Sequence, residues 1–113
     1  MKKRQMRLAE EIRDIVANTI TIELSDQRTR GVVVTHVRLS PDSTIATVYF
    51  RFYGDGYEKE EVQKGLESCK GYLKGTLSKT LDYLRRVPDL RFVYDESVEE
   101  GSRIEGLLSK LKP

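Results

Sequence analysis

A long amphipathic helical pattern from Glu58 to Arg86, interrupted near its middle, constrains the fold more than any other feature of the chain. Its apolar side chains recur at spacings of three and four, as on a helix face packed against a core. These side chains are Val62, Leu66, Cys69, Leu73, Leu77, Leu81 and Leu84. Gly71 interrupts the pattern, and a glycine inside a helix costs about 1 kcal/mol relative to alanine. The segment 69–71 therefore predicts a bend, which also turns Lys70 out of the apolar stripe.

Length and composition indicate one folded domain over residues 1–113. The chain is 38% hydrophobic and 34% charged, which is typical of a globular protein. No apolar run approaches the roughly 18 residues of a membrane span, and polar residues follow the basic amino terminus, so we expect neither a membrane partner nor a signal peptide. The single cysteine forms no internal disulfide, which favours a reducing, cytoplasmic location. We expect a monomer, because no exposed apolar seam is evident.

The rest of the chain predicts one more long helix and three strands. An apolar stripe indicates a helix from about Arg4 to Leu24. Its members are Leu8, Ile12, Ile15, Thr19 and Ile22. Segments rich in β-branched residues predict strands at 32–39, 44–53 and 90–94, the first two joined by a tight turn. We expect the core faces of this hairpin to be Val33, Thr35, Val37 and Leu39 on one strand and Ala46, Val48, Phe50 and Phe52 on the other.

The predicted order is helix, strand, strand, helix, kink, helix, strand. Three strands with helices on one face make an α+β two-layer sandwich. Ser97 and the acidic residues after it resemble a capping box, so we expect a short C-terminal helix or tail from about residue 97.

Charge is segregated along the chain, although the formal net charge is only +2. Basic residues gather in the two helical regions, whereas acidic residues gather at 55–61 and 95–100. This segregation suits a polyanionic partner. From charge alone, basic residues that merely solubilise helix faces explain the pattern equally well.

Three stretches of sequence resemble a known family. They are THVRLSPD at 35–42, ATVY at 46–49 and RVPDLRFVYDES at 86–97. On these residues the chain resembles ribosome-binding factor A, a small bacterial protein with a type II KH fold. The resemblance implies an assembly factor that binds the small (30S) ribosomal subunit precursor through 16S rRNA and promotes late maturation and rRNA processing. Two alternatives stay open: a generic KH-like binder of other RNA, and a protein-interaction module outside the ribosome.

The resemblance also assigns a role to the interrupted helix. KH domains clamp a nucleic-acid backbone with a Gly-x-x-Gly loop, which this chain lacks. The resembled family has an Ala-x-Gly interruption instead, and Cys69, Lys70 and Gly71 occupy its position as the expected helix kink. A small residue and a glycine let the helix bend and let a backbone approach. Alternatively, Gly71 only separates two helices without touching RNA. The expected RNA-binding residues are Lys70, Gly71, Lys74, Ser78, Arg85, Arg86, Arg4 and Arg7. On a straight helix Lys74, Ser78 and Arg85 share one outward strip.

Two positions depart from the family pattern. Gln27 stands where the family usually has proline, yet the charged residues beside it still predict the end of the first helix. His36 stands where the family often has aspartate, and we expect a structural or solvent-facing role for it.

No pattern predicts catalysis or a cofactor. The only histidine and the only cysteine lie on different predicted elements, and no metal-ligand spacing, Walker loop or dinucleotide fingerprint occurs. Cys69 lies on the apolar stripe and is expected to be a small buried side chain rather than a reactive thiol. We therefore expect a binding protein and not an enzyme, with no metal, cofactor or small-molecule substrate.

Overall fold

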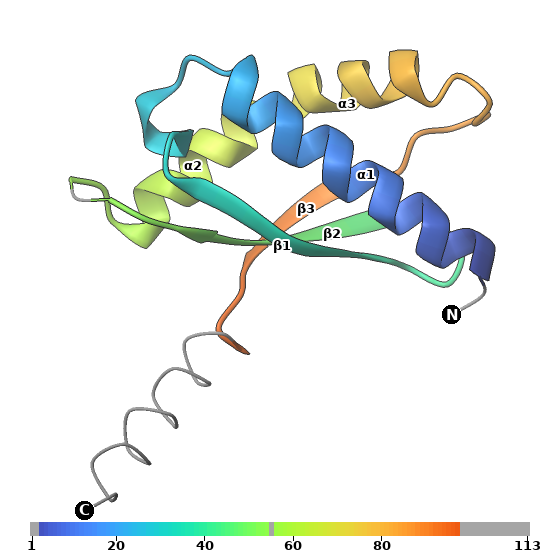
Figure 1. Cartoon of the computed structure of the whole chain (residues 1–113), viewed down its shortest axis with the longest axis horizontal. Coiled ribbons are helices and arrows are strands. Elements are labelled where there is room, and N and C mark those ends of the chain that lie inside the picture. Colours follow the sequence, from blue (N-terminus) through green and yellow to red (C-terminus); the bar gives the residue numbers. More distant parts are fainter. Residues whose placement is uncertain (1–2, 55, 98–113) are drawn as a thin grey trace, which may run out of the picture.

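A three-stranded sheet carries helices on one of its faces (Figure 1). The structure is a computed structural model that describes residues 3–54 and 56–97. In chain order the elements are α1 (Lys3–Ile22), the 3-10 helix η1 (Gln27–Thr29), β1 (Val32–Leu39), β2 (Ile45–Phe52), α2 (Lys59–Ser68), α3 (Lys70–Thr80) and β3 (Asp89–Tyr94). The predicted α+β order is confirmed. The C-terminal helix or tail expected from about residue 97 lies almost wholly outside the described residues.

The sheet is mixed, with the strand order β1-β2-β3. β1 pairs antiparallel with β2, as their short connection requires, whereas β3 pairs parallel with β2. Parallel neighbours need a long crossover connection, and α2 and α3 supply it. These two helices and α1 cover the same face of the sheet, so no described helix covers the opposite face (Figure 1).

The core lies between the helix layer and the sheet. It combines the apolar stripes of three helices with one face of the strands. The apolar residues that are at most 1% exposed include Ile12, Val16, Ala46, Val48, Phe50, Val62, Leu66, Leu73 and Leu77. Ile22 is an exception to the predicted stripe of α1, because it is the last helical residue and is 70% exposed. Ile20, which the stripe did not include, is buried instead.

A β-bulge in β1 changes which side chains face the core. The register with β2 shifts between Val34 and His36, so strict alternation fails at that point. Val37 is buried as expected, but Val33 is 45% exposed and Thr35 is only partly buried. The predicted core face of the first strand is therefore wrong before the bulge, because the extra residue moves the preceding side chains to the other face. The core face predicted for the second strand is confirmed.

Asp95, immediately after β3, holds the bulged strand in place. Its carboxylate accepts hydrogen bonds from the Thr35 hydroxyl at 2.6 Å and from the Ser97 backbone N–H at 3.1 Å. Its own backbone N–H donates to the Phe50 carbonyl at 2.8 Å. The side chain is only 5% exposed. Hydrogen bonds from Ser97 and then from Thr35 hold the pKa of Asp95 below its usual value of 3.8.

We expect Asp95→Ala to lower the free energy of unfolding by about 2 kcal/mol at pH 7, since it leaves buried hydrogen-bond partners unsatisfied. Because the folded pKa is depressed, this contribution is complete above the usual value of 3.8 and is lost as the pH falls through the folded value. Urea unfolding between pH 7 and pH 2 measures the difference. Asp14→Ala is the control, because Asp14 is 72% exposed and makes only a surface ion pair. A pH-independent difference between wild type and Asp95→Ala would contradict the charged role.

Candidate nucleic-acid interface

The two crossover helices meet at Cys69, where the interrupted pattern predicted a bend. α2 ends at Ser68, Cys69 has φ −95° and ψ −2°, and α3 begins at Lys70. The Cys69 thiol is free, and the side chain packs against the core without being fully buried. It fills space behind the junction as a small apolar group does.

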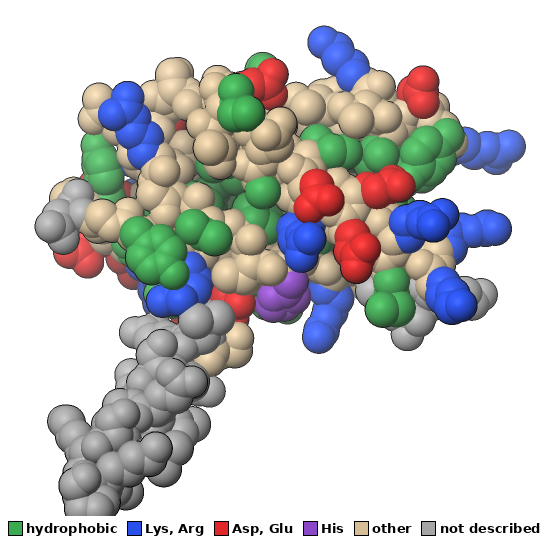
Figure 2. Space-filling model, viewed as in Figure 1, with side chains coloured by type: hydrophobic (Ala, Val, Ile, Leu, Met, Phe, Trp, Pro, Cys, Tyr) green, Lys and Arg blue, Asp and Glu red, His purple; other side chains and the backbone are tan. Residues whose placement is uncertain are grey.

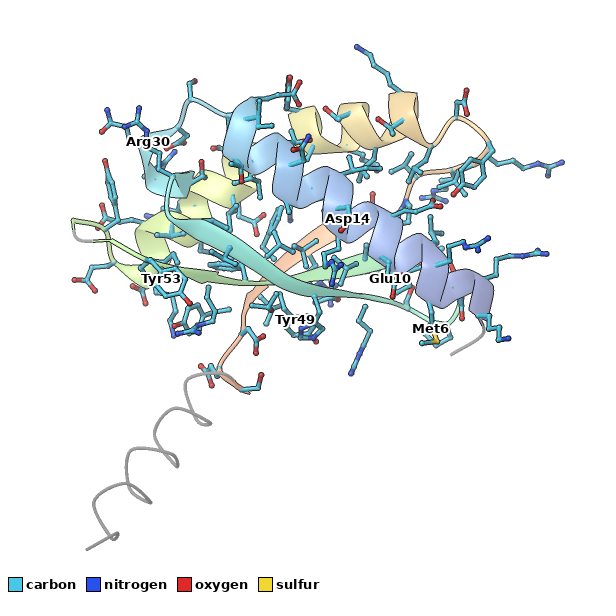
Figure 3. All side chains as sticks on the ribbon, viewed as in Figure 1. Met6, Glu10, Asp14, Arg30, Tyr49 and Tyr53 are labelled. Carbon is cyan, nitrogen blue, oxygen red and sulfur yellow. The ribbon has the colours of Figure 1, made fainter. Side chains whose placement is uncertain are left out.

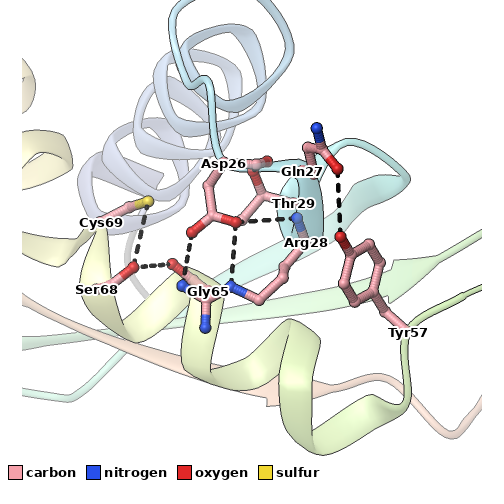
Figure 4. A network of polar contacts seen from close by, with 8 residues as sticks. All are labelled: Asp26, Gln27, Arg28, Thr29, Tyr57, Gly65, Ser68 and Cys69. Atoms are coloured by element: carbon pink, nitrogen blue, oxygen red, sulfur yellow. Dashed lines mark hydrogen bonds and ion pairs between the residues drawn. The ribbon is translucent and has the colours of Figure 1, made fainter.

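A polar network supports this junction from the side of η1 (Figure 4). Asp26 accepts a hydrogen bond from the Arg28 backbone N–H at 2.9 Å, and the Arg28 guanidinium pairs with the same carboxylate at 2.7 Å. η1 lies so close to α2 that a Cβ added to Gly65 would be 3.0 Å from the Arg28 Cβ. α1 ends before Gln27, as predicted, although no proline is present there.

Gly71 lies on the exposed side of α3, in its first turn. A Cβ added to it would meet no atom within 4 Å, and its φ is not positive. The same is true of Gly75, one turn further along. The fold therefore requires glycine at neither position. The prediction that Gly71 interrupts the helix is wrong, because the helices are separated at Cys69 and Gly71 is itself helical. Together Gly71 and Gly75 leave helix backbone without side chains and open to an approaching molecule.

Basic side chains beside this bare backbone converge on one carboxylate. The ammonium group of Lys74 on α3 forms an ion pair with Asp89, the first residue of β3. The Lys74 hydrogen bond, helped by the charges of Lys74, Arg86 and Lys70, holds the pKa of Asp89 below its usual value. Lys70 itself pairs with Glu67 at 2.6 Å. Lys70 and Lys74 are one turn apart on α3, as their spacing indicates, and the structure adds the charge of Arg86 beside the same carboxylate, which the spacing does not show.

These ion pairs leave the cations available to a ligand. The Lys70 side chain is 38% exposed and that of Lys74 is 45% exposed. Surface ion pairs of this kind contribute at most about 1 kcal/mol. Phosphate oxygens accept charge-assisted hydrogen bonds from ammonium groups, so they can replace Glu67 and Asp89 at little cost. We call Lys70, Gly71, Lys74, Ser78 and Arg86 the kink surface.

α3 ends earlier than the periodicity predicted. Leu81 has φ −103° and ψ 57°, which takes the chain out of the helix and into a loop over residues 81–88. Arg85 is exposed in this loop and does not share a helical strip with Lys74 and Ser78, contrary to the prediction. The cause is tertiary, because the chain has to turn there to enter β3 parallel to β2.

The amino-terminal end of α1 lies beside the same loop. The Tyr83 hydroxyl donates a hydrogen bond to Glu11 at 2.5 Å, and the charge of Arg7 acts on the same phenol. Arg4 and Arg7 line one groove on α1. Lys and Arg side chains gather at this end of the molecule, on the right in Figure 2. Arg86 belongs to the same loop, residues 81–88, which therefore connects the end of α1 that carries Arg7 with the kink surface.

Several charged residues near these elements were not predicted. The contact between Lys74 and Asp89 depends on how α3 and β3 pack, whereas Glu67 and Lys70 are three positions apart, a spacing that indicates such a pair. No role was predicted for Arg38, Arg51 and Arg91, which lie on the face of the sheet without helices. Their signal was present in the sequence, since each stands between two core residues of a strand.

Within residues 3–54 and 56–97, no group of three or more His, Cys, Asp or Glu side chains is arranged to hold a metal. No helix in the described part of the chain is both long and apolar enough to cross a membrane. What these residues offer a ligand at the kink is positive charge and exposed backbone.

Comparison with known proteins identifies close relatives. The family described as "Ribosome-binding factor A" matches residues 4–108. The ribosome-binding factor A of Geotalea daltonii is 37% identical over 111 residues, which cover 98% of this chain and 89% of that protein. That of Anaeromyxobacter sp. (strain K) is 42% identical over 110 residues, which cover 96% of this chain and 79% of that protein.

Solved structures show the same fold. The crystal structure of ribosome-binding factor A from Thermus thermophilus superposes with a TM-score of 0.74 at 26% identity, covering 82% of this chain and 97% of that one. A homology model of the Thermus thermophilus protein, fitted into the electron cryo-microscopy map of its complex with the 30S subunit, matches with a TM-score of 0.66 at 26% identity. That match covers 81% of this chain and 96% of the other.

Proposed function

This chain belongs to the ribosome-binding factor A family, and we propose that it binds the small ribosomal subunit through 16S rRNA as an assembly factor. The relative placed in a 30S complex has the same fold, which supports the small subunit as the partner. The factor would act on a late precursor, promoting maturation and rRNA processing, and would hold an immature conformation or screen its completion. We place it in the cytoplasm, as a monomer.

The observation that carries this proposal is the kink surface. Lys74 pairs with Asp89, on which the charges of Lys70 and Arg86 also act, and Lys70 is the chain neighbour of Gly71, whose backbone is exposed. We infer that rRNA phosphates replace the carboxylates on the two lysines, while the open helix backbone lets the ribose-phosphate chain approach closely. Arg4, Arg7 and Arg85 then extend the contact along the end of α1 and the loop. The contact needs no bond to be made or broken, so we propose binding without catalysis or a cofactor.

Sucrose-gradient sedimentation of cell extracts tests the proposed partner. We expect the tagged chain to sediment with free small subunits and to be absent from translating ribosomes. Crosslinking in cells then maps the bound positions of 16S rRNA. A chain that stays at the top of the gradient and crosslinks to other RNA would identify a generic RNA-binding protein. One that crosslinks only to proteins would identify an interaction module.

We expect Gly71→Leu to weaken binding to isolated small subunits about tenfold while the fold is retained. A bulky side chain would block the backbone contact, and the loss of one charge-assisted hydrogen bond is worth about 1.5 kcal/mol. A Cβ at this exposed position meets no atom within 4 Å, and a helix favours leucine over glycine, so circular dichroism and the thermal midpoint should be unchanged or slightly improved. Gly71→Ala is the control, with a side chain too small to block the approach. If folded Gly71→Leu binds as tightly as wild type, the kink has a structural role and does not contact RNA.

A further inference from the structure

The face of the sheet without helices carries its own set of positive charges. Arg38 of β1 and Arg91 of β3 flank Thr47 of β2 in one row across the sheet. Strands lie about 4.8 Å apart, so the two arginine backbones are about 10 Å from each other. Arg51 is further along β2, next to Val33. We call the outward residues of the three strands the open face; they include Val33, His36, Arg38, Thr47, Tyr49, Arg51, Arg91 and Val93.

Rigid aromatic rings lie between these arginines. His36 and Tyr49 are cross-strand partners whose rings stack with centroids 4.2 Å apart and planes 12° from parallel. The His36 side chain is 45% exposed, so the stack is accessible to a ligand. The guanidinium of Arg51 lies 5.2 Å from the centre of the Tyr53 ring. Tyr49 and Tyr53 both project from the side of the sheet away from the helices (Figure 3).

The positive charges of the open face are not balanced within the described residues. Arg38, Arg51 and Arg91 form no ion pair there, and the Nε atom of Arg51 is buried without a hydrogen-bond acceptor. Two carboxylates stand at outward positions of β3 and the residue after it. Asp89 is already bound to Lys74, and Asp95 is buried, is occupied by its own hydrogen bonds and lies 3.6 Å from the Nδ1 atom of His36. The guanidinium groups of Arg38, Arg51 and Arg91 can therefore bind acceptors from outside this part of the chain, and the Nε–H of Arg51 has no acceptor within it.

The chemistry of the face indicates which partner supplies those acceptors. A second copy of the chain would bring arginine against arginine, which is unfavourable. Single-stranded RNA offers phosphates to the guanidinium groups and flat bases to the rings, and both kinds of contact are general features of RNA-binding sheets. Aromatic stacking between positive charges matches a nucleic acid better than it matches an acidic protein surface.

We propose that the open face is a second RNA-binding surface, which holds single-stranded RNA through Arg38, Arg51 and Arg91 and stacks a base on the His36–Tyr49 pair. It lies on the opposite side of the sheet from α2 and α3 and is separate from the kink surface (Figure 1). The proposal does not depend on which RNA the kink surface binds. It gives the protein contacts on both sides of one thin sheet, with β3 at the edge between them.

The test uses the full chain and a fluorescein-labelled ten-nucleotide oligouridine as the probe. Arg38→Gln, Arg51→Gln and Arg91→Gln together should weaken binding at least tenfold and reduce the slope of log affinity against log salt by about two, since each single-strand phosphate contact contributes about 0.7. His36→Ala should weaken binding about five- to hundredfold with little change in that slope, since stacking is not ionic. Ultraviolet crosslinking of the bound oligouridine should modify the peptide that contains Tyr49.

The control changes Arg30, Lys64 and Lys79 to glutamine, which alters the net charge equally at exposed positions outside both surfaces. Its affinity for oligouridine should stay within about twofold of wild type. An arginine variant that remains folded and binds as wild type overturns the proposal, and so does a wild-type chain that does not bind the probe. The proposal is also overturned if the triple arginine variant binds oligouridine as wild type does and differs only in self-association or in binding to other proteins. Binding to small subunits is measured in a separate assay, so the proposed function is tested independently of the result with oligouridine.

Discussion

Changing Lys74, Arg85 and Arg86 together to glutamate should weaken binding to isolated small subunits by about a hundredfold or more at physiological salt. Each lost charge-assisted contact is worth about 1.5 kcal/mol, and the introduced carboxylates add repulsion from the phosphates. The slope of log affinity against log salt should fall by about three, because each Lys or Arg that contacts a phosphate contributes about one. Filter binding over a range of salt concentrations measures both quantities.

The control for this variant applies the same charge reversal at Arg30, Lys64 and Lys79, which are exposed and lie outside both surfaces. It carries the same net charge, so non-specific attraction to RNA changes equally in the two proteins. Both should remain folded, because the reversed side chains are on the surface and surface ion pairs such as Lys74–Asp89 contribute little to stability. If the folded kink variant binds as tightly as wild type, or loses no more affinity than the control, the kink surface does not hold rRNA.

A substitution at Asp89 tests whether its ion pair with Lys74 competes with the proposed phosphate contact of Lys74. In Asp89→Asn, the competing carboxylate is gone but the neighbouring lysine is unchanged. If phosphate replaces Asp89 on Lys74, this variant should bind small subunits a few-fold more tightly than wild type. Weaker binding would instead mean that Asp89 positions Lys74 for the contact.

Gly31→Ala should be the most destabilising of the small substitutions, lowering the free energy of unfolding by about 3 kcal/mol. Gly31 comes directly before β1, and a Cβ on it would lie 1.8 Å from the Tyr53 carbonyl oxygen. The clash is with backbone, so no side chain can move aside to relieve it. It would also disturb the hydrogen bond from the Tyr53 N–H to the Gly31 carbonyl, 2.9 Å long, which closes that end of the hairpin.

Gly71→Ala is the matched control for this prediction. It makes the same chemical change at a glycine where a Cβ meets no atom within 4 Å, and a helix favours alanine over glycine. Urea unfolding followed by circular dichroism should therefore give a lower midpoint for Gly31→Ala and an equal or higher midpoint for Gly71→Ala. Equal midpoints for the two variants would show that the hairpin end opens without cost.

The candidate site was predictable from the sequence only in part. A bend within residues 69–71 was predicted from Gly71, and the lysines around it follow from helical spacing, both of which are local signals; the structure places the break itself at Cys69. The pairing of Lys70 with Glu67 is also local, since the two residues are three positions apart, but the pairing of Lys74 with Asp89 joins residues 15 positions apart and depends on packing. The prediction that Arg85 shares a helical strip with Lys74 and Ser78 was wrong for a related reason. Helical spacing does not show where packing stops a helix.

The sequence by itself determined the order of the elements, the apolar faces of the helices and the interruption at residues 69–71. Each of these follows from the period of apolar residues over a short window. Tertiary structure alone decided that β1 carries a bulge, that Val33 therefore faces outward, that α3 ends at Thr80 and that Lys74 pairs with Asp89. These features depend on pairing and packing between residues far apart in the chain, and local periodicity contains no information about such contacts.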